Sequence, residues 1–233
     1  AEWDSVQLVA RSWAALSRYS RELSQDAVID LASYLAQEFA YAFADKEDEA
    51  GFNGDGTSTY HGINGVLSKA AAGSVHTAAA TRLAFSDLTF DEFETVVGKL
   101  PDYADMGGAR WYISRTGYFA SMARLLNAAG GNTIETLEGG PTRSFLGYPV
   151  EFAQVLTSDT GDQASTAVCC FGDLNQACML GNRQEIRVQP LVERYAEFRQ
   201  IGVIADYRMD INFHESGDAT TAGSMVVLKT PAA

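Results

Sequence analysis

The most regular hydrophobic pattern in the chain lies between Asp26 and Glu49. Apolar side chains recur there every three or four residues, which is the spacing of an α-helix that buries one face. The apolar positions are Val28, Leu31, Leu35, Phe39 and Phe43, with Ala32, Ala36 and Ala40 beside them. We expect Asp26 to cap this helix and Gly51 to end it. About 24 residues at ~1.5 Å each give a rod of ~36 Å, which is long for a domain of this size.

Shorter elements surround the long helix. Val6 to Trp13 alternate loosely, as a strand does, and a polar connection from Ser17 to Ser24 follows. The sequence Thr-Phe-Asp-Glu at Thr89 is a capping box, and it predicts a helix that runs to about Leu100. The remaining patterns of this half predict a strand at 110–114, a helix at 116–128 and an irregular loop at 68–81.

The second half of the chain is rich in strand patterns. Predicted strands cover Phe145–Val150, Ser165–Phe171, Ala177–Leu180, Ile186–Val188, Tyr195–Asn212 and Met225–Leu228. Pro149 has no amide N–H, so we expect the first of these strands at a sheet edge. A polar loop at 156–163 follows it. Helices among the early strands and a strand-rich second half together indicate an α+β fold.

Residues 52–67 carry four glycines, two asparagines, an aspartate and a histidine. A calcium-binding loop counted from Asn53 needs glycine at its sixth position and glutamate at its twelfth, where Ser58 and Asn64 stand. A phosphate-binding loop needs Gly-Lys-Ser/Thr or Gly-x-Gly-x-x-Gly, and neither motif is present. What remains is turn chemistry, because glycine adopts positive φ and Asn and Asp bond to nearby backbone. This stretch therefore predicts a reversal of the chain after the long helix.

The 233-residue chain has a formal net charge of −13, and its arginines and lysines form no run. Such a surface repels nucleic acid, so we expect no sequence-specific DNA binding. No stretch of eighteen apolar residues predicts a transmembrane helix, and no signal peptide is recognised. The chain opens with Ala1, which indicates processing or trimming. Cys169, Cys170 and Cys178 lack the spacing of a disulfide framework and are interpreted as reduced core residues.

No pattern predicts a catalytic, cofactor-binding or metal-binding residue. The motifs Gly-x-Ser-x-Gly and His-Glu-x-x-His are absent, and His61, His76 and His214 are far apart in loop-like contexts. The acidic run Asp45-Lys-Glu-Asp-Glu49 stands out instead, because acidic side chains at a helix C-terminus oppose its dipole. Two interpretations remain: a solvated helix end, or a patch that meets an arginine of a neighbouring subunit. The interface candidates in this run are Asp45, Glu47, Asp48 and Glu49.

The order of several motifs resembles that of tailed-bacteriophage major capsid proteins, which have the Hong Kong 97-like capsid fold. In that family a long spine helix ends in Lys-Glu-Asp/Glu and is followed by Asn-Gly-Asp-Gly-Thr and Gly-Ile/Leu. Those residues stand here at 46–48, 53–57 and 62–63. Weaker matches at 109–114, 146–150, 170–174, 204–210 and 225–229 extend the resemblance over nearly the whole chain.

The resemblance implies a wedge-shaped subunit with two domains. A peripheral P-domain would comprise residues 1–112 and 188–233, with the remnant of an extended E-loop at 1–13 and the spine helix at about 26–49. An axial A-domain would comprise residues 113–187. It would point a loop at the pentamer and hexamer axes, with the interface candidates Ser158, Asp159, Thr160, Gly161 and Asp162. The rest of the E-loop and the N-terminal arm of the family are expected to be largely missing.

The resemblance also implies a function. The chain would be a structural major capsid (coat) protein, not an enzyme, that self-assembles into pentamers and hexamers of an icosahedral phage head enclosing double-stranded DNA. Assembly would take place in the bacterial host cytoplasm, with portal, scaffolding or decoration proteins as further partners and no membrane. Some relatives crosslink subunits through a Lys–Asn bond promoted by a carboxylate, which would fall near Asp206. Because Arg199 stands where the asparagine is expected, that activity is not carried over.

Three alternatives remain open. An encapsulin or a gene transfer agent shell would share the same fold. A small cytosolic α+β enzyme would need convergent titratable groups in a pocket, which no motif indicates. A DNA-binding accessory protein is disfavoured by the net charge.

Overall fold

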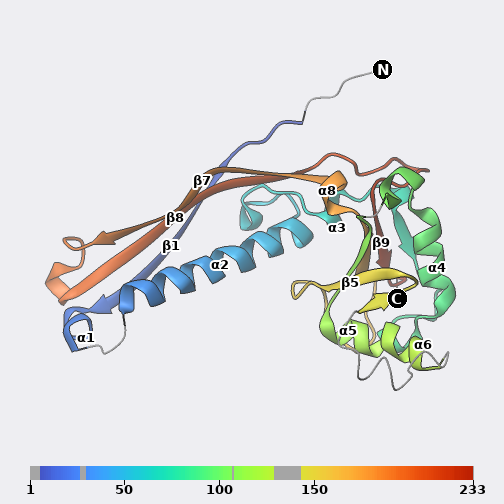
Figure 1. Cartoon of the computed structure of the whole chain (residues 1–233), viewed down its shortest axis with the longest axis horizontal. Helices are drawn as coiled ribbons and strands as arrows, with labels where there is room; N and C mark the ends of the chain where they lie inside the picture. The colour runs from blue at the N-terminus through green and yellow to red at the C-terminus, as the bar shows by residue number, and fades with distance from the viewer. Residues whose placement is uncertain (1–5, 27–29, 107, 129–142, 233) are drawn as a thin grey trace.

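The computed structural model describes residues 6–26, 30–106, 108–128 and 143–232. They form a long arm joined to a compact part (Figure 1). The arm holds a three-stranded sheet with the longest helix beneath it, and the compact part holds a six-stranded sheet with shorter helices beside it. This mixture of helix and sheet confirms the predicted α+β class.

The sheet of the arm is antiparallel, with the strand order β1 (Arg11–Ser20), β8 (Gln200–Phe213) and β7 (Cys178–Leu191). Its central strand, β8, alternates between buried and half-buried residues along nearly its whole length. The buried positions of β8 face the long helix, and they are Val203, Ala205, Tyr207, Met209, Ile211 and Phe213. This alternation places an apolar layer on one side of the sheet.

The long helix α2 runs from Leu31 to Asn53, so its predicted length is confirmed but both predicted ends are wrong. Asp30 is the N-cap, since its carboxylate accepts the amide of Ala32 at 3.1 Å. The predicted cap, Asp26, instead ends α1 (Arg21–Asp26). Gly51 does not stop the helix because Ile211 packs 3.5 Å from the position its Cβ would take, so tertiary contact outweighs its low helix propensity.

The predicted side of α2 faces the sheet. Phe39 and Phe43 are buried in the arm core together with Ala50, while Val28 lies outside the described residues. The helix ends at Gly54, whose amide bonds to the Ala50 carbonyl at 3.0 Å.

The glycine-rich stretch after α2 reverses the chain, as predicted. Asp55 and Asn64 form an antiparallel bridge across the reversal. Gly56 and Gly62 have φ angles of 79° and 78°, which favour glycine. The chain then enters the short helix α3 (Val66–Lys69).

Strand β1 begins later than predicted. Residues 7–9 lie against the outer face of β8 through side chains, because the Val9 amide donates to Asp210 at 2.6 Å and Asn212 donates to the Gln7 carbonyl at 2.9 Å. Ladder pairing starts at Arg11 and continues to Ser20, so half of the expected polar connection is strand. Pairing with β8, which lies far away in the sequence, decided this position.

The two predicted strands at 177–180 and 186–188 belong to the single strand β7. Its pairing with β8 shifts register between Asn182 and Gln184 and again between Gln184 and Arg187. These shifts interrupt the alternation by which a strand is recognised. The predicted strand at 195–212 is confirmed only from Gln200, because a 3-10 turn at Ala196–Phe198 forms the tip of the β7–β8 hairpin.

The sheet of the compact part has six short strands. In spatial order they are β2 (Val75–Thr77), β9 (Met225–Lys229), β6 (Ala167–Gly172), β3 (Arg110–Ile113), β5 (Tyr148–Phe152) and β4 (Ser144–Phe145). Pairs β2–β9 and β3–β5 are parallel and the other pairs are antiparallel. The strands predicted at 110–114, 165–171 and 225–228 are confirmed.

Two sequence-based assignments in the compact part are wrong. The predicted edge strand at 145–150 is a hairpin, with Leu146 and Gly147 at positive φ between β4 and β5, so β4 is the edge. The predicted loop at 68–81 contains α3, which begins at 66, and β2. Elements of three or four residues are too short to show a period.

Helices α4 (Phe90–Lys99), α5 (Arg115–Ala120) and α6 (Met122–Ala128) accompany this sheet. Helix α4 has its predicted bounds, but the capping box is wrong because the Thr89 side chain makes no cap bond. The helix predicted at 116–128 breaks at Ser121, whose hydroxyl donates to the Gly117 carbonyl at 2.6 Å.

Strands β6 and β9 join the two hydrophobic cores of the molecule. Val226 and Leu228 pack in the core of the compact part, while Met225 and Val227 pack in the core of the arm. The neighbouring residues Cys169 and Cys170 lie in different cores, and both are buried, as expected for core residues. Burial raises the pKa of the Cys170 thiol to about 12.

Sheet membership groups the chain differently from the predicted domain bounds. Residues 178–187 of β7 pair with β8 in the arm, although they were assigned to the A-domain. Strands β2, β3 and β9 pair within the compact sheet, although they were assigned to the P-domain. The division into a P-domain at 1–112 and 188–233 and an A-domain at 113–187 stays a prediction.

Candidate assembly surface

The acidic end of α2 contains carboxylates in unlike environments. Asp45 is exposed, and Glu49 is paired with Lys46. Glu47 is half-buried, and the Tyr207 hydroxyl donates to it at 3.4 Å. Burial raises the pKa of Glu47, and the charge of Asp48 raises it further.

The pKa of Asp48 is also raised, first by burial and then by the charge of Asp45. These carboxylates therefore disfavour one another's charge in the isolated chain. A cation brought by another molecule would relieve that repulsion.

The five candidates at 158–162 form an exposed loop between β5 and β6. The loop is ordered by its own side chains, since the Gly161 amide donates to the Asp159 carboxylate at 3.0 Å. Buried Gln163 closes its base, where it accepts from Thr157 at 2.8 Å and donates its backbone amide to the Leu83 carbonyl at 3.0 Å. The base of the loop is thus held by hydrogen bonds at Gln163, and residues 158–162 are exposed to solvent.

The two groups of candidates are not brought together. No hydrogen bond or ion pair between described residues joins the acidic end of α2 to the loop at 158–162. Asp48 instead lines a cleft at the junction of arm and compact part, opposite Arg110 and Asp173. Arg110 is paired with Glu151 at 2.8 Å, and Asp173 accepts the amide of Asn175 at 2.9 Å, where it caps helix α8 (Leu174–Ala177).

The cleft contains one phenol and four charged side chains. Its phenol, Tyr112, has a pKa raised to about 12 by burial and stays protonated near neutral pH. Its charged groups other than Asp48 are partnered with one another or with backbone, as described above. Within the described ranges, no group of three or more His, Cys, Asp or Glu side chains is placed to hold a metal ion. The same residues include no helix long and apolar enough to cross a bilayer.

An apolar row along β7 is a surface feature that the sequence analysis missed. We call these residues the β7 row: Leu180, Ile186, Val188, Pro190 and Val192. Leu180 is 51% exposed, Val188 is 42% exposed and Val192, just beyond the strand, is 49% exposed. The spacing of two between residues 186 and 192 was a signal for it.

The β7 row lies on the same side of the sheet as α2. Leu180, Val188 and Pro190 stand opposite the buried residues Ile211, Ala205 and Val203 of β8. Directly opposed residues of neighbouring strands share a face. The helix therefore covers the apolar side of β8 and leaves that of β7 open.

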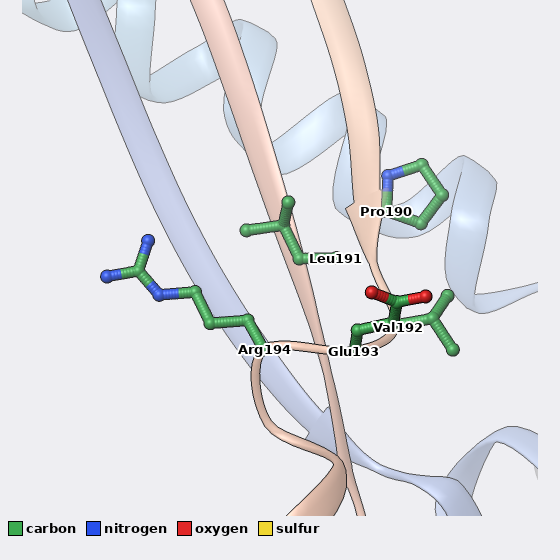
Figure 2. Close-up of a pocket in the computed structure, with 5 residues that line it drawn as sticks. All are labelled: Pro190, Leu191, Val192, Glu193 and Arg194. Atoms are coloured by element: carbon green, nitrogen blue, oxygen red, sulfur yellow. The ribbon is translucent and has the colours of Figure 1, made fainter.

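The hairpin tip at the end of the arm is also exposed. Figure 2 shows the tip pocket, where Leu191 and Arg194 point to one side of the chain, and Pro190 and Val192 to the other. Beyond it, Phe198 is 64% exposed.

An ordered base supports this tip. Tyr195 packs against Gly202. The guanidinium carbon of Arg18 lies 5.2 Å from the centre of the Tyr195 ring. The tip thus combines arginines with an uncovered aromatic side chain on a fixed base.

A long arm with an exposed apolar row on one strand is typical of a protein that associates through its surface. Comparison with known families agrees. The model of the phage capsid family matches residues 1–216, and the chain belongs to that family.

Solved structures with the same fold include a capsid and an encapsulin. A capsid of a native GTA particle, computed with C5 symmetry, is 20% identical, has a TM-score of 0.79 and aligns over 98% of this chain and 75% of its own. A structure from Mycobacterium phage Adephagia is 20% identical with a TM-score of 0.68, covering 97% and 73%. The SrpI encapsulin of Synechococcus elongatus is 12% identical with a TM-score of 0.65, covering 95% and 74%. The search of curated proteins finds no match.

The protein is therefore a shell-forming coat protein with the predicted capsid fold.

Proposed function

We propose that this chain is the major capsid protein of an icosahedral phage head, which it builds as pentamers and hexamers around double-stranded DNA. The observation that carries the proposal is the β7 row, an apolar surface that the folded chain leaves open to solvent. Apolar surface arranged along one element is typical of a protein–protein contact. The match to the phage capsid family supplies the kind of assembly.

In this proposal the P-domain, residues 1–112 and 188–233, contains α2, β1 and β8 of the arm, and the A-domain, residues 113–187, contains β5 and β6 of the compact part. The acidic candidates Asp45, Glu47, Asp48 and Glu49 would meet cations of a neighbouring subunit. The loop at 158–162 would point toward the symmetry axis of a pentamer or hexamer. The role of the protein would be structural, without catalysis.

The net charge of −13 suits an inner wall that must not adhere to packaged DNA. Portal, scaffolding or decoration proteins would be further partners, and assembly would take place in the cytoplasm of the bacterial host. A gene transfer agent or an encapsulin would use the same fold, and the similarity to a GTA capsid and to an encapsulin keeps both as alternatives.

The test is the association state of the purified chain. We expect light scattering after size exclusion to show species larger than a monomer, and negative-stain microscopy to show rings, sheets or shells. Extraction of DNA or of a protein cargo from such particles would separate a phage or gene transfer agent from an encapsulin. A chain that stays monomeric over a wide range of concentration and salt would contradict self-assembly.

A further inference from the structure

The β7 row borders a groove between the long helix and the sheet. Ala40 and Ala44 leave room on the helix side, since alanine has the shortest apolar side chain. The full lining is Ala40, Phe43, Ala44 and Glu47 from α2, and Asn182, Glu185, Ile186 and Tyr207 from the sheet. Small residues at its floor and Ile186 at its rim make a trough that accepts an apolar side chain.

The groove is open because one helix is too narrow for three strands. An α-helix with its side chains is ~10 Å across, and neighbouring strands are ~4.8 Å apart. Helix α2 therefore covers about two strands, and it lies over β1 and β8, whose residues Trp13 and Tyr207 are buried with it. The third strand keeps its apolar side without a cover among the residues that the structure describes.

The groove carries negative charge. The described residues that line it include two carboxylates, Glu47 and Glu185, and no lysine or arginine. Burial removes part of the hydration of the Glu47 carboxylate and raises its pKa, so a nearby cation would stabilise the charged form. An occupant should thus pair an apolar side chain with a positive one.

The hairpin tip of the same chain presents that pair. Phe198 is 64% exposed, and Arg199 follows it directly in a left-handed conformation with φ of 53°. Among the described residues, Arg199 forms one distant ion pair, 3.9 Å from Glu22, and both side chains are mostly exposed. Such a pair is screened by water and contributes little, so the guanidinium is available to a partner.

Strand addition is a poor alternative for this edge. The register shifts between Asn182 and Arg187 distort the backbone of β7, and Pro190 lacks an amide N–H. An edge of this kind does not accept another strand along its length. Contact through side chains is the mode that the geometry favours.

We propose that the groove beside the β7 row binds the hairpin tip of a second copy of this chain, with Phe198 against the row and Arg199 at Glu185 and Glu47. The proposal rests on the proposed function, since it names one contact of the self-assembly. Tip and groove are different surfaces, so the contact is heterologous and passes from copy to copy. It can therefore close into rings or extend over a lattice.

The first experiment compares two substitutions on opposite sides of β7. Val188→Asp places a charge in the row, whereas Gln189→Asp places the same charge on the outer side, opposite Ile204. We expect the first to raise the concentration needed for half-maximal association by about tenfold or more, the loss of ~1.4 kcal/mol per contact, and the second to change it little. Circular dichroism and melting of each variant verify that the chain still folds.

The second experiment identifies the occupant by exchanging charges. Glu185→Arg and Arg199→Glu should each weaken association, and the double variant should recover most of it, because the two charges attract again in reverse order. A mixture of Val188→Cys and Phe198→Cys chains should form a disulfide-linked dimer under mild oxidation. Each cysteine variant alone serves as the control for the native thiols.

The outcomes separate the two proposals. If the wild-type chain never associates, the proposed function fails and this contact fails with it. If the wild type associates and Val188→Asp does so equally well, the function stands and the groove is not a contact. If Val188→Asp weakens association but the charge exchange gives no recovery and the cysteines do not link, the groove has another occupant and the proposal is wrong.

Discussion

Glu92 shows how a local motif is overruled by its surroundings. The sequence places it three residues after Thr89, where a capping box is expected. Its carboxylate turns instead to His76 and Arg82, and it accepts the Ala79 amide at 3.1 Å. Those partners are 10 to 16 residues away, so a motif of four residues contains no information about them.

The buried Glu92 predicts a defined dependence of stability on pH. Burial alone raises its pKa, but the Ala79 amide, His76 and Arg82 outweigh burial and hold the pKa below the ordinary 4.5. A lowered pKa in the folded chain means that the stabilisation is present above about pH 4.5 and is lost as the pH falls through the folded value. We expect Glu92→Gln to lower the free energy of unfolding by about 2 kcal/mol at neutral pH.

The same substitution should flatten the acid limb of the stability profile. Urea unfolding at pH 7, 5 and about 3.5 measures both effects. Glu94→Gln is a matched control, since Glu94 is exposed on the same helix. An unchanged acid limb in Glu92→Gln would show that another group carries the dependence.

At the scale of elements, the long helix was predictable because its period is local. The stripe that contains Phe39 and Phe43 identified its buried face, and both side chains are at most 6% exposed. Its ends were not predictable in the same way. The low helix propensity of Gly51 predicts a helix end there, but the helix continues past Gly51, where it packs close to Ile211.

Substitution on the two faces of α2 tests this packing. Phe43→Asp buries a charge without a partner, so we expect loss of cooperative folding of the arm. Tyr41→Asp, at a position that is 65% exposed, should melt within a few degrees of the wild type. Thermal circular dichroism distinguishes them, and a Phe43→Asp chain that melts like the control would show that the helix does not pack through this face.

Alanine substitution should have opposite effects on stability at two glycines, one in the chain reversal after α2 and one in α4. A Cβ on Gly65 would lie 2.5 Å from the Phe52 carbonyl oxygen, whereas one on Gly98 in α4 would meet nothing within 4 Å. Gly65→Ala should destabilise the protein by about 2–4 kcal/mol through backbone displacement. Gly98→Ala should stabilise it by roughly 0.5–1 kcal/mol, because alanine favours a helix interior. Denaturant midpoints of the two variants test the difference in sign.

At the scale of the molecule, the two hydrophobic cores are joined rather than separate. Strand β9 sends alternate side chains into each, as Val226 and Val227 show. Disruption of one core therefore removes support from the other. The arm and the compact part should unfold together despite their different shapes.

Two buried tryptophans report on this coupling. Trp13 lies in the arm core and Trp111 in the core of the compact part. Single-tryptophan variants that retain one or the other, with Trp3 also replaced, should give coincident urea transitions. Val227→Ala should move both midpoints together. Separate transitions would mean that the arm unfolds independently.

The sequence by itself determined the features that depend on near neighbours along the chain. The apolar stripe of α2, the glycine and asparagine turn at 54–65, the strand-rich second half and the negative charge are of this kind. So is the order of motifs that resembles a capsid protein. Helical period and turn conformation involve residues only a few positions apart, and these can be interpreted in one dimension.

Only the tertiary structure decided how distant segments meet. It set the start of β1 through pairing with β8, joined two short patterns into β7 and turned Glu92 toward His76. It also left the β7 row open, because coverage depends on the width of a helix relative to a sheet of three strands. Register and coverage arise from contacts between residues far apart in sequence, which no local pattern encodes.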